Sequence, residues 1–278
     1  MYPEDKYLLE IKPKSKFSFG FKEILSYWEL LYFFTWREIK VKYKQTVLGF
    51  LWVILQPVLM TLVFTFFLGS AITNMTKLNI PYPLFALSGM VIWSFFSSGL
   101  SNAANSMVNN SNIIKKVYFP RLIIPFSAIL SSSIDFMISL GLLFAALLYF
   151  GAPVNWLHLL YLPLALIMIS FATLGIGMFL AALNIKYRDV RYMLPFFIQG
   201  MLFISPIMFP VSISNNAIAT TILQFNPVAG ALELIRSIFG NYELNWMTVG
   251  YSSISTLVFF LIGLYYFRKT EAYFADLA

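Results

Sequence analysis

The sequence has 278 residues, of which 59% are hydrophobic and only 11% are charged, and its mean hydropathy is +0.77. A soluble domain carries roughly 25% charged residues, so this composition excludes a water-soluble fold and indicates an all-α polytopic membrane protein. Cysteine is absent, which excludes disulfides, thiolate metal sites and cysteine nucleophiles. The net charge of +7 is spread along the chain in small clusters, which argues against nucleic-acid binding.

The N-terminal part of the chain shows a polar tail followed by an amphipathic pattern. Residues 1–20 mix acidic and basic side chains and lack the apolar core of a signal peptide, so we expect a short cytoplasmic tail. Residues 21–46 predict one helix that lies in the membrane surface, with its aromatic face among the lipid headgroups. Its apolar stripe recurs at intervals of three and four residues and consists of Phe21, Ile24, Leu25, Trp28, Tyr32, Trp36, Ile39 and Tyr43.

Six membrane spans are predicted within residues 47–267, because a bilayer crossing needs about 20 apolar residues. Their expected bounds are 47–72, 82–108, 122–150, 156–183, 192–212 and 247–267. Every Lys and Arg except Lys77 and Arg236 falls in the N-terminal segment, in alternate links or in the tail 268–278. By the positive-inside rule, both termini are expected in the cytoplasm.

Polar side chains inside the second and third spans leave two interpretations open. The second span carries four of them on one helix face: Ser98, Asn102, Asn105 and Asn109. Lipid cannot satisfy these groups, so they predict either hydrogen bonds between helices or the wall of a conduit for a hydroxyl-rich solute. Asp135, inside the third span, is either a functional acid or part of a structural cluster with a neighbouring serine or an asparagine of the second span.

Two basic links connect spans on the predicted cytoplasmic side. The first, residues 111–121, places Val117, Tyr118 and Phe119 between cations. An exposed apolar tip of this kind is unfavourable unless a partner covers it, so the link predicts a docking site for another protein. The second link places Asp189 among cations that include Arg188, for which local ion pairing is the simpler interpretation.

The region after the second link breaks the regular pattern. Residues 192–232 carry no formal charge, and Pro195, Pro206 and Pro210 interrupt them, so we expect a fifth span that ends near residue 212. Residues 213–240 then predict an external gate, because irregular backbone at membrane depth must be buried by protein or lined by water. A short helix after Asn226 is expected to carry Glu233 and Arg236 as a pair on its external side.

No motif for nucleotide binding or hydrolysis is present in the sequence. It contains no G-x-x-x-x-G-K-[ST] loop, no G-x-S-x-G, no H-E-x-x-H and no acidic metal cluster. The sequence therefore argues against an enzyme. Work against a gradient would have to be driven by a partner or by an ion.

Four stretches together resemble the membrane subunits of type-2 ABC exporters of cell-surface polysaccharides. The first is the run from Trp36 to Gly49 with Trp52 and Gln56-Pro57. The others are Phe119-Pro120-Arg121, then Tyr187-Arg188-Asp189-Val190, and finally Ser205 to Pro210 followed by Asn226-Pro227. The likeness runs from residue 21 onward. It is strongest to the permeases that export O-antigen, a part of lipopolysaccharide, with the teichoic-acid permeases as close kin.

The resemblance implies partners, location and candidate sites. It implies a homodimer in the bacterial cytoplasmic (inner) membrane with two separate ATP-binding cassette subunits, which would hold ATP and magnesium while this chain holds no cofactor. It implies a lipid-linked polysaccharide as substrate. The residues it places at the ATPase subunits are Trp36, Arg37, Lys40, Lys115, Lys116, Val117, Tyr118, Phe119, Pro120, Arg121, Arg188 and Asp189. Those at the external gate are Pro210, Asn226, Pro227, Glu233 and Arg236.

The path of the substrate is expected to be lined by aromatic and polar side chains. Aromatic residues make up 18% of the chain, and ring faces can stack on sugars. Candidates for the path are Phe66, Trp93, Phe203 and Phe209, together with Ser98, Asn102, Asn105, Asn109 and Asp135. Two alternatives stay open: an exporter of teichoic acid, lipid or drug with the same fold, and a membrane-embedded sugar or acyl transferase. The transferase would depend on His158, Glu233 or Glu243 outside the membrane.

Overall fold

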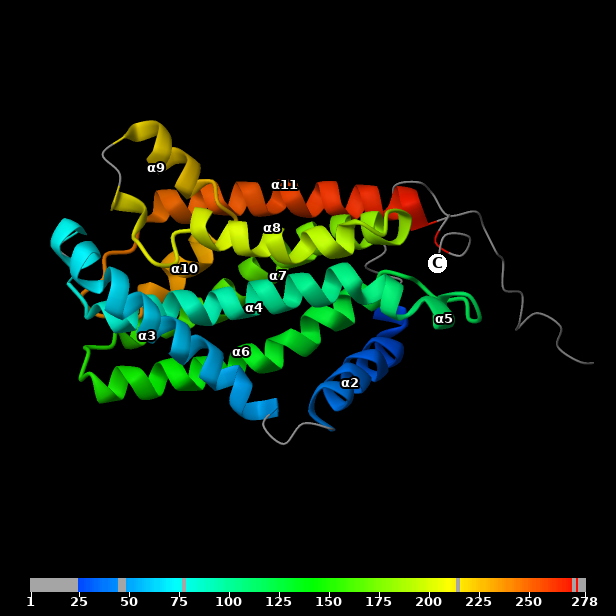
Figure 1. The fold of residues 1–278 in the computed structure, drawn as a ribbon, viewed down its shortest axis with the longest axis horizontal. Coiled ribbons are helices and arrows are strands. Elements are labelled where there is room, and N and C mark those ends of the chain that lie inside the picture. The colour runs from blue at the N-terminus through cyan, green and yellow to red at the C-terminus, as the bar shows by residue number, and fades with distance from the viewer. Residues whose placement is uncertain (1–24, 45–48, 77–78, 214–215, 272–273, 275–278) are drawn as a thin grey trace, which may run out of the picture.

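The computed structural model describes residues 25–44, 49–76, 79–213, 216–271 and 274. These residues form a helical bundle (Figure 1), as the composition predicts. The tail 1–20, the first residues of the amphipathic pattern, Lys77 and most of the C-terminal tail lie outside the described residues, so the predictions made for them stay untested.

Five described helices are long and apolar enough to cross a membrane. They are α3 (Gly49–Thr76), α4 (Tyr82–Asn109), α6 (Ile123–Tyr149), α7 (Tyr161–Lys186) with the preceding 3-10 turn η2 (Trp156–Leu160), and α11 (Trp246–Glu271). Each coincides with a predicted span within a few residues. Long, charge-poor runs determine these helices, because in lipid only a helix satisfies all of their backbone polar groups.

The bounds of the fifth predicted span are wrong. The helix α8 runs from Val190 to Ile204, and its 15 residues are fewer than the ~20 that a bilayer crossing needs. The helix ends because Pro206 disfavours helical backbone at Ser205, which adopts φ −83° and ψ 145°. The short turn η3 (Val211–Ile213) follows.

A bent helix pair follows η3, as expected for the segment between the last two spans. The helices α9 (Ala217–Gln224) and α10 (Ala229–Arg236) meet at 85° and together pass as one broken span or a re-entrant element. The side chain of Asn226 at the bend accepts from the backbone N–H of Val228 at 2.9 Å and donates to the hydroxyl of Ser205 at 3.0 Å. The bend is therefore tied to the end of α8.

The bundle is organised around α4, which packs against α3, α6 and α7, while α7 also packs against α11. Glycines make the contact between α7 and α11 possible. A Cβ added at Gly175 would lie 2.6 Å from Cα of Phe260, and one at Gly177 would lie 2.7 Å from Cβ of Ala103 on α4. Both glycines therefore allow neighbouring helices to approach closely.

The two ends of the bundle differ in charge. The short helix α5 (Ser111–Ile114) and the C-terminal end of α11 lie at one end, which we call the α5 end, and α9 and α10 lie at the other, the α9–α10 end (Figure 1). The described cations that are exposed at the α5 end are Lys115, Lys116, Lys186, Arg188, Arg191 and Lys269. Among the described residues at the α9–α10 end, Arg236 is the one Lys or Arg, and it is buried.

The helix α2 (Trp28–Lys44) forms within the segment that the amphipathic pattern predicts to be helical, and it packs on α6. Phe34 is its buried residue. The aromatic stripe, represented by Trp28, Tyr32 and Trp36, stays exposed. These three rings therefore lie on the surface of the chain, while another face of α2 contacts the bundle.

Candidate functional site

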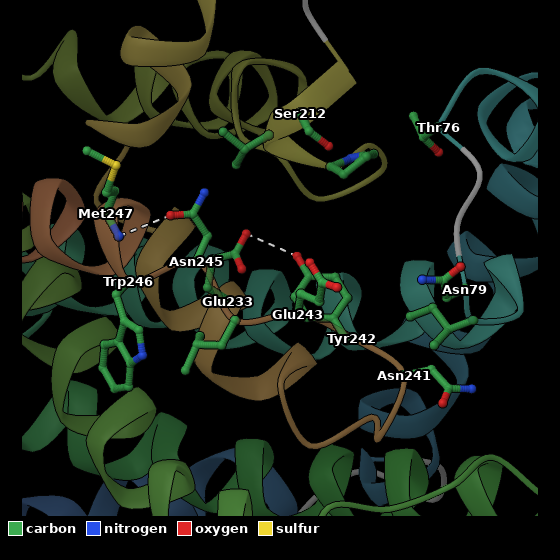
Figure 2. A pocket seen from close by; sticks show the side chains of 14 residues that line it. Thr76, Asn79, Ser212, Glu233, Asn241, Tyr242, Glu243, Asn245, Trp246 and Met247 are labelled. Carbon is green, nitrogen blue, oxygen red and sulfur yellow. Dashed lines mark hydrogen bonds between the residues drawn. The ribbon is translucent and has the colours of Figure 1, made fainter.

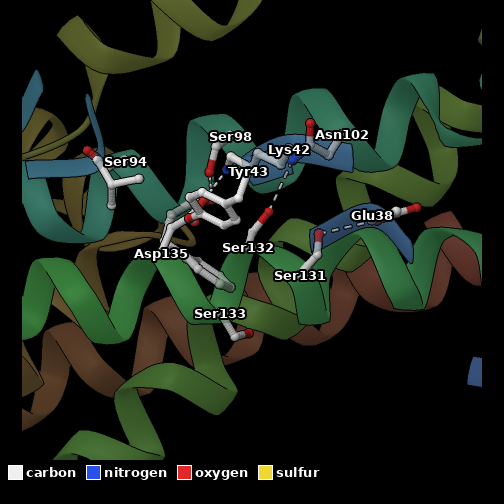
Figure 3. Close-up of polar contacts among 12 residues, drawn as sticks. Glu38, Lys42, Tyr43, Ser94, Ser98, Asn102, Ser131, Ser132, Ser133 and Asp135 are labelled. Carbon is white, nitrogen blue, oxygen red and sulfur yellow. Dashed lines mark hydrogen bonds and ion pairs between the residues drawn. The ribbon is translucent and has the colours of Figure 1, made fainter. Parts of the chain in front are cut away.

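A row of polar contacts joins α2 to α6 (Figure 3). The carboxylate of Glu38 accepts hydrogen bonds from the hydroxyls of Ser131 at 3.2 Å and Ser127 at 3.5 Å. Lys42 forms an ion pair with Asp135, and the Tyr43 hydroxyl donates to the same carboxylate. We call Glu38, Lys42, Tyr43, Ser131 and Asp135 the α2–α6 polar contact. Residues four apart on a helix share a face, so the pairs 38/42 and 131/135 present matching rows.

Asp135 has a partner that the sequence analysis did not name. Its side chain is 11% exposed and that of Lys42 is 40% exposed, so the pair is buried on one side only. The predicted partners, a neighbouring serine or an asparagine of the second span, are wrong for this carboxylate. The partner was missed because α2 and α6 are far apart in the sequence, whereas in the fold α2 reaches along α6 from Ser127 to Asp135, about 12 Å at 1.5 Å per residue.

Burial affects the protonation of two α2 groups in this contact. It raises the pKa of Glu38 above the ordinary value of 4.5, while the Ser131 hydrogen bond and the charge of Arg37 oppose the rise. Burial, with the hydrogen bond and the charge of Asp135, raises the pKa of the Tyr43 phenol. Tyr43 therefore stays a neutral hydrogen-bond donor to Asp135.

The polar stripe of α4 makes hydrogen bonds between helices. Asn102 Nδ2 donates to the hydroxyl of Ser132 on α6 at 3.3 Å. Asn184 on α7, which the sequence analysis missed, donates to Oδ1 of Asn105 at 3.1 Å and to the carbonyl of Ala104 at 2.9 Å. The inter-helix interpretation is thus confirmed for Asn102 and Asn105. The hydroxyl of Ser98 donates within α4, to the carbonyl of Phe95 at 3.4 Å.

The link after α5 has a smaller exposed tip than predicted. Tyr118 is 83% exposed and Val117 is also exposed, but Phe119 is 5% exposed. Its ring packs on that of Phe34 with centroids 5.5 Å apart. Including Phe119 in the exposed tip was wrong, because this ring turns inward and closes the core beneath α2. Pro120 is buried as well.

Two arginines that were predicted to contact the ATPase subunits join segments of this chain at the α5 end. Arg37 donates to the side chain of Asn110 and lies 4.7 Å over the Phe34 ring. The guanidinium of Arg121 donates to the carbonyl of Glu271 at the end of α11. Both therefore have structural partners within the chain. The other predicted contact residues that remain exposed are Trp36, Lys40, Lys115, Lys116, Arg188 and Asp189.

The predicted path aromatics fall in different environments. Trp93 is buried and packs on Phe96 with ring centroids 5.4 Å apart, so it faces no surface of the chain. Phe66 on α3 and Phe203 on α8 are exposed, and Phe209 is half-buried. Asn109 is exposed at the end of α4.

Glu233 and Arg236 point inward, so their predicted placement on the external side of the helix is wrong. They are 4% and 1% exposed. The guanidinium of Arg236 donates to the carbonyls of Pro206 at 2.9 Å and Ile207 at 2.7 Å, and it lies 3.6 Å over the ring of Phe85. The backbone carbonyls after the end of α8 lack helical hydrogen-bond donors, and a buried cation needs acceptors. The hydrogen bonds from Arg236 to these carbonyls meet both needs.

A cavity of about 570 Å³ opens at the α9–α10 end (Figure 2). Residues from the end of α3, from η3, from α10 and from the segment 241–247 line it, and Pro210 is among them. Glu233 lies at its wall, where Oε1 accepts a hydrogen bond from the Tyr242 hydroxyl at 3.0 Å. Within the described residues no three His, Cys, Asp or Glu side chains gather in a way that could hold a metal ion.

Comparison with known proteins places these features in context. Residues 29–240 match the family described as ABC-2 type transporter. The chain is similar to the "O-antigen export system permease protein RfbA" of Klebsiella pneumoniae, 28% identical over 265 residues, which are 95% of this chain and 98% of that protein. The protein of that name from Myxococcus xanthus is 28% identical over 80% of this chain and 85% of its own length. The "Polysialic acid transport protein KpsM" of Escherichia coli is 26% identical over 84% of this chain and 91% of its own.

Proposed function

This chain belongs to the ABC-2 type transporter family as a membrane subunit, and we propose that it is the permease that exports lipid-linked O-antigen, or a related cell-surface polysaccharide, across a bacterial cytoplasmic membrane. The observation that carries the proposal is the near full-length likeness to permeases of O-antigen export, which covers 95% of the chain. Five helices able to span a membrane support a transport role.

ATP hydrolysis in this proposal belongs to a separate subunit. The sequence holds no phosphate-cradling loop of its own, and membership in the family implies an ATP-binding partner. ATP and magnesium would accordingly bind there. The exposed pair Val117 and Tyr118, flanked by Lys115 and Lys116, offers an apolar tip within a basic surface, which suits docking to that partner.

The α5 end faces the cytoplasm in this proposal, and the α9–α10 end faces outward. The exposed cations of the described chain support the assignment, because the positive-inside rule counts Lys and Arg near the ends of spans. Both termini are then cytoplasmic. Arg236 does not weaken this difference in exposed positive charge between the two ends, because its side chain is buried.

A homodimer would supply the conduit. The helix α3 has only 11% of its most apolar stretch buried inside the chain, and in α8 only Val190 and Leu194 are buried. Two copies that join through these helices would place the exposed rings of Phe66 and Phe203 at the seam. Aromatic faces there would contact sugars without requiring one pattern of hydroxyls.

The test is genetic and biochemical. Cells that lack this chain, or lack the ATP-binding subunit encoded with it, should lose the surface polysaccharide and accumulate lipid-linked glycan inside. Purification of the tagged chain from the wild-type strain should recover the ATP-binding subunit. Normal surface polysaccharide in both deletion strains would refute polysaccharide export and direct the search to a lipid or drug substrate for the same fold.

A further inference from the structure

The wall of the cavity at the α9–α10 end includes the buried carboxylate of Glu233 (Figure 2). Glu233 is 4% exposed, and while its Oε1 accepts from Tyr242, its Oε2 has no hydrogen-bond partner among the described residues. The backbone N–H of Asn245 also lies near this carboxylate. Buried polar atoms are almost always satisfied, so an unpaired carboxylate oxygen at a cavity wall indicates a donor supplied from within the cavity.

The other lining side chains define what that donor belongs to. Asn241 and Asn245 offer amides and Glu243 offers a second carboxylate, while the exposed ring of Trp246 offers an apolar face. None of the described lining residues is a Lys or Arg. The nearby Arg236 donates to the carbonyls of Pro206 and Ile207 instead. Acceptor carboxylates, amides and one aromatic face match a ligand rich in hydroxyl donors and disfavour an anion.

The dimensions agree with a small organic ligand. A volume of about 570 Å³ falls in the range of roughly 300–1,000 Å³ that is typical of ligand sites. A metal ion fits less well, because no group of three metal-binding side chains occurs among the described residues.

We propose that this cavity is a binding subsite for uncharged sugar residues, in which Glu233 and Glu243 accept hydrogen bonds from sugar hydroxyls and Trp246 stacks on the sugar ring. The source of the sugar rests on the proposed function, since an exported polysaccharide would pass the α9–α10 end as it leaves the membrane. The subsite would hold successive residues of the emerging chain.

The experiment measures sugar binding by the intact complex of this chain and its ATP-binding subunit in lipid nanodiscs. Saturation-transfer NMR would be recorded with the methyl glycosides of glucose, galactose, mannose and N-acetylglucosamine, and with glucuronic acid as the anionic probe. We expect binding of at least one uncharged glycoside and none of glucuronic acid. Trp246→Ala and Glu243→Gln should each weaken binding about tenfold, the effect of losing one good contact.

Trp156→Ala is the matched control, because Trp156 is another exposed tryptophan but is absent from the cavity lining. It should bind sugar as the wild type does. Glu233→Gln should abolish binding, and the exposed positions 243 and 246 keep the test decisive if that buried substitution prevents assembly. Absence of glycoside binding in the wild type, undiminished binding in Trp246→Ala, or a preference for glucuronic acid would overturn the proposal.

The outcome separates this inference from the proposed function. Loss of surface polysaccharide in the deletion strain, together with no sugar binding at the cavity, would refute only the subsite. Sugar binding at the cavity with normal surface polysaccharide in the deletion strain would refute only polysaccharide export.

Discussion

The ion pair between Lys42 and Asp135 should respond differently to the loss of each partner. In Lys42→Ala the Asp135 side chain, 11% exposed, loses its ion-pair partner and retains the hydrogen bond from Tyr43. Breaking a buried pair in this way costs about 3–5 kcal/mol. In Asp135→Asn the Lys42 side chain, 40% exposed, can turn to water, so we expect a loss of about 1 kcal/mol.

The assay is the apparent unfolding temperature of the purified chain in nanodiscs, read from intrinsic tryptophan fluorescence. Lys42→Ala should lower it clearly more than Asp135→Asn does, and the double variant should be more stable than Lys42→Ala alone, because no charge is then left buried. Glu29→Gln, an exposed acid on the same helix, is the control and should change nothing. Equal losses in the two single variants, or additive losses in the double variant, would refute the reasoning.

Three further predictions follow from the described contacts. Replacing Val117 and Tyr118 by Ser should reduce recovery of the ATP-binding subunit at least several-fold with an unchanged unfolding temperature, whereas Phe119→Ser should lower that temperature, because Phe119 is part of the core. Arg236→Met should destabilise the chain by about 2–4 kcal/mol, since the carbonyls of the segment after α8 lose a charged donor, and thermal unfolding checks this. The raised pKa of Glu38 means that the folded chain favours the protonated acid, so stability should fall as the pH rises from 4.5 to the raised value, and Glu38→Gln should flatten that dependence.

Each of these predictions has an outcome that would contradict it. Normal recovery of the ATP-binding subunit by the Val117 and Tyr118 variant would remove the docking role. An Arg236→Met chain as stable as the wild type would mean that the carbonyls find water instead. A wild-type stability that rises between pH 4.5 and neutrality would show that the hydrogen bond from Ser131 outweighs the burial of Glu38.

The helices were predictable because their cause is local. A long, charge-poor apolar run must be a helix in lipid, and this applies to α3, α4, α6, α7 and α11. The end of α8 was misplaced because Pro206 acts more strongly on the backbone than the apolar pattern that continues past it. The spacing of the asparagines on α4 predicted a shared polar face, and of its two open interpretations the contact with other helices holds for Asn102 and Asn105.

The candidate sites depended on contacts between distant segments, which leave little local pattern. Lys42 and Asp135 are 93 residues apart, and the spacing of apolar residues in either helix does not indicate that they are partners. One usable signal was the repeat of polar residues at 38/42 and at 131/135, which share the same four-residue step. Another was Arg236, a lone cation in the predicted external segment beside a proline-broken region whose carbonyls needed a donor.

The central claim is that this chain moves a lipid-linked polysaccharide across the membrane with energy from ATP. The most direct measurement uses inside-out membrane vesicles that contain the chain, its ATP-binding subunit and the lipid-linked glycan, with a membrane-impermeant lectin as the probe. The account predicts that ATP and magnesium render the glycan inaccessible to the lectin, and only when both subunits are present. A glycan that stays fully accessible after ATP addition, or becomes protected without this chain, would contradict the claim.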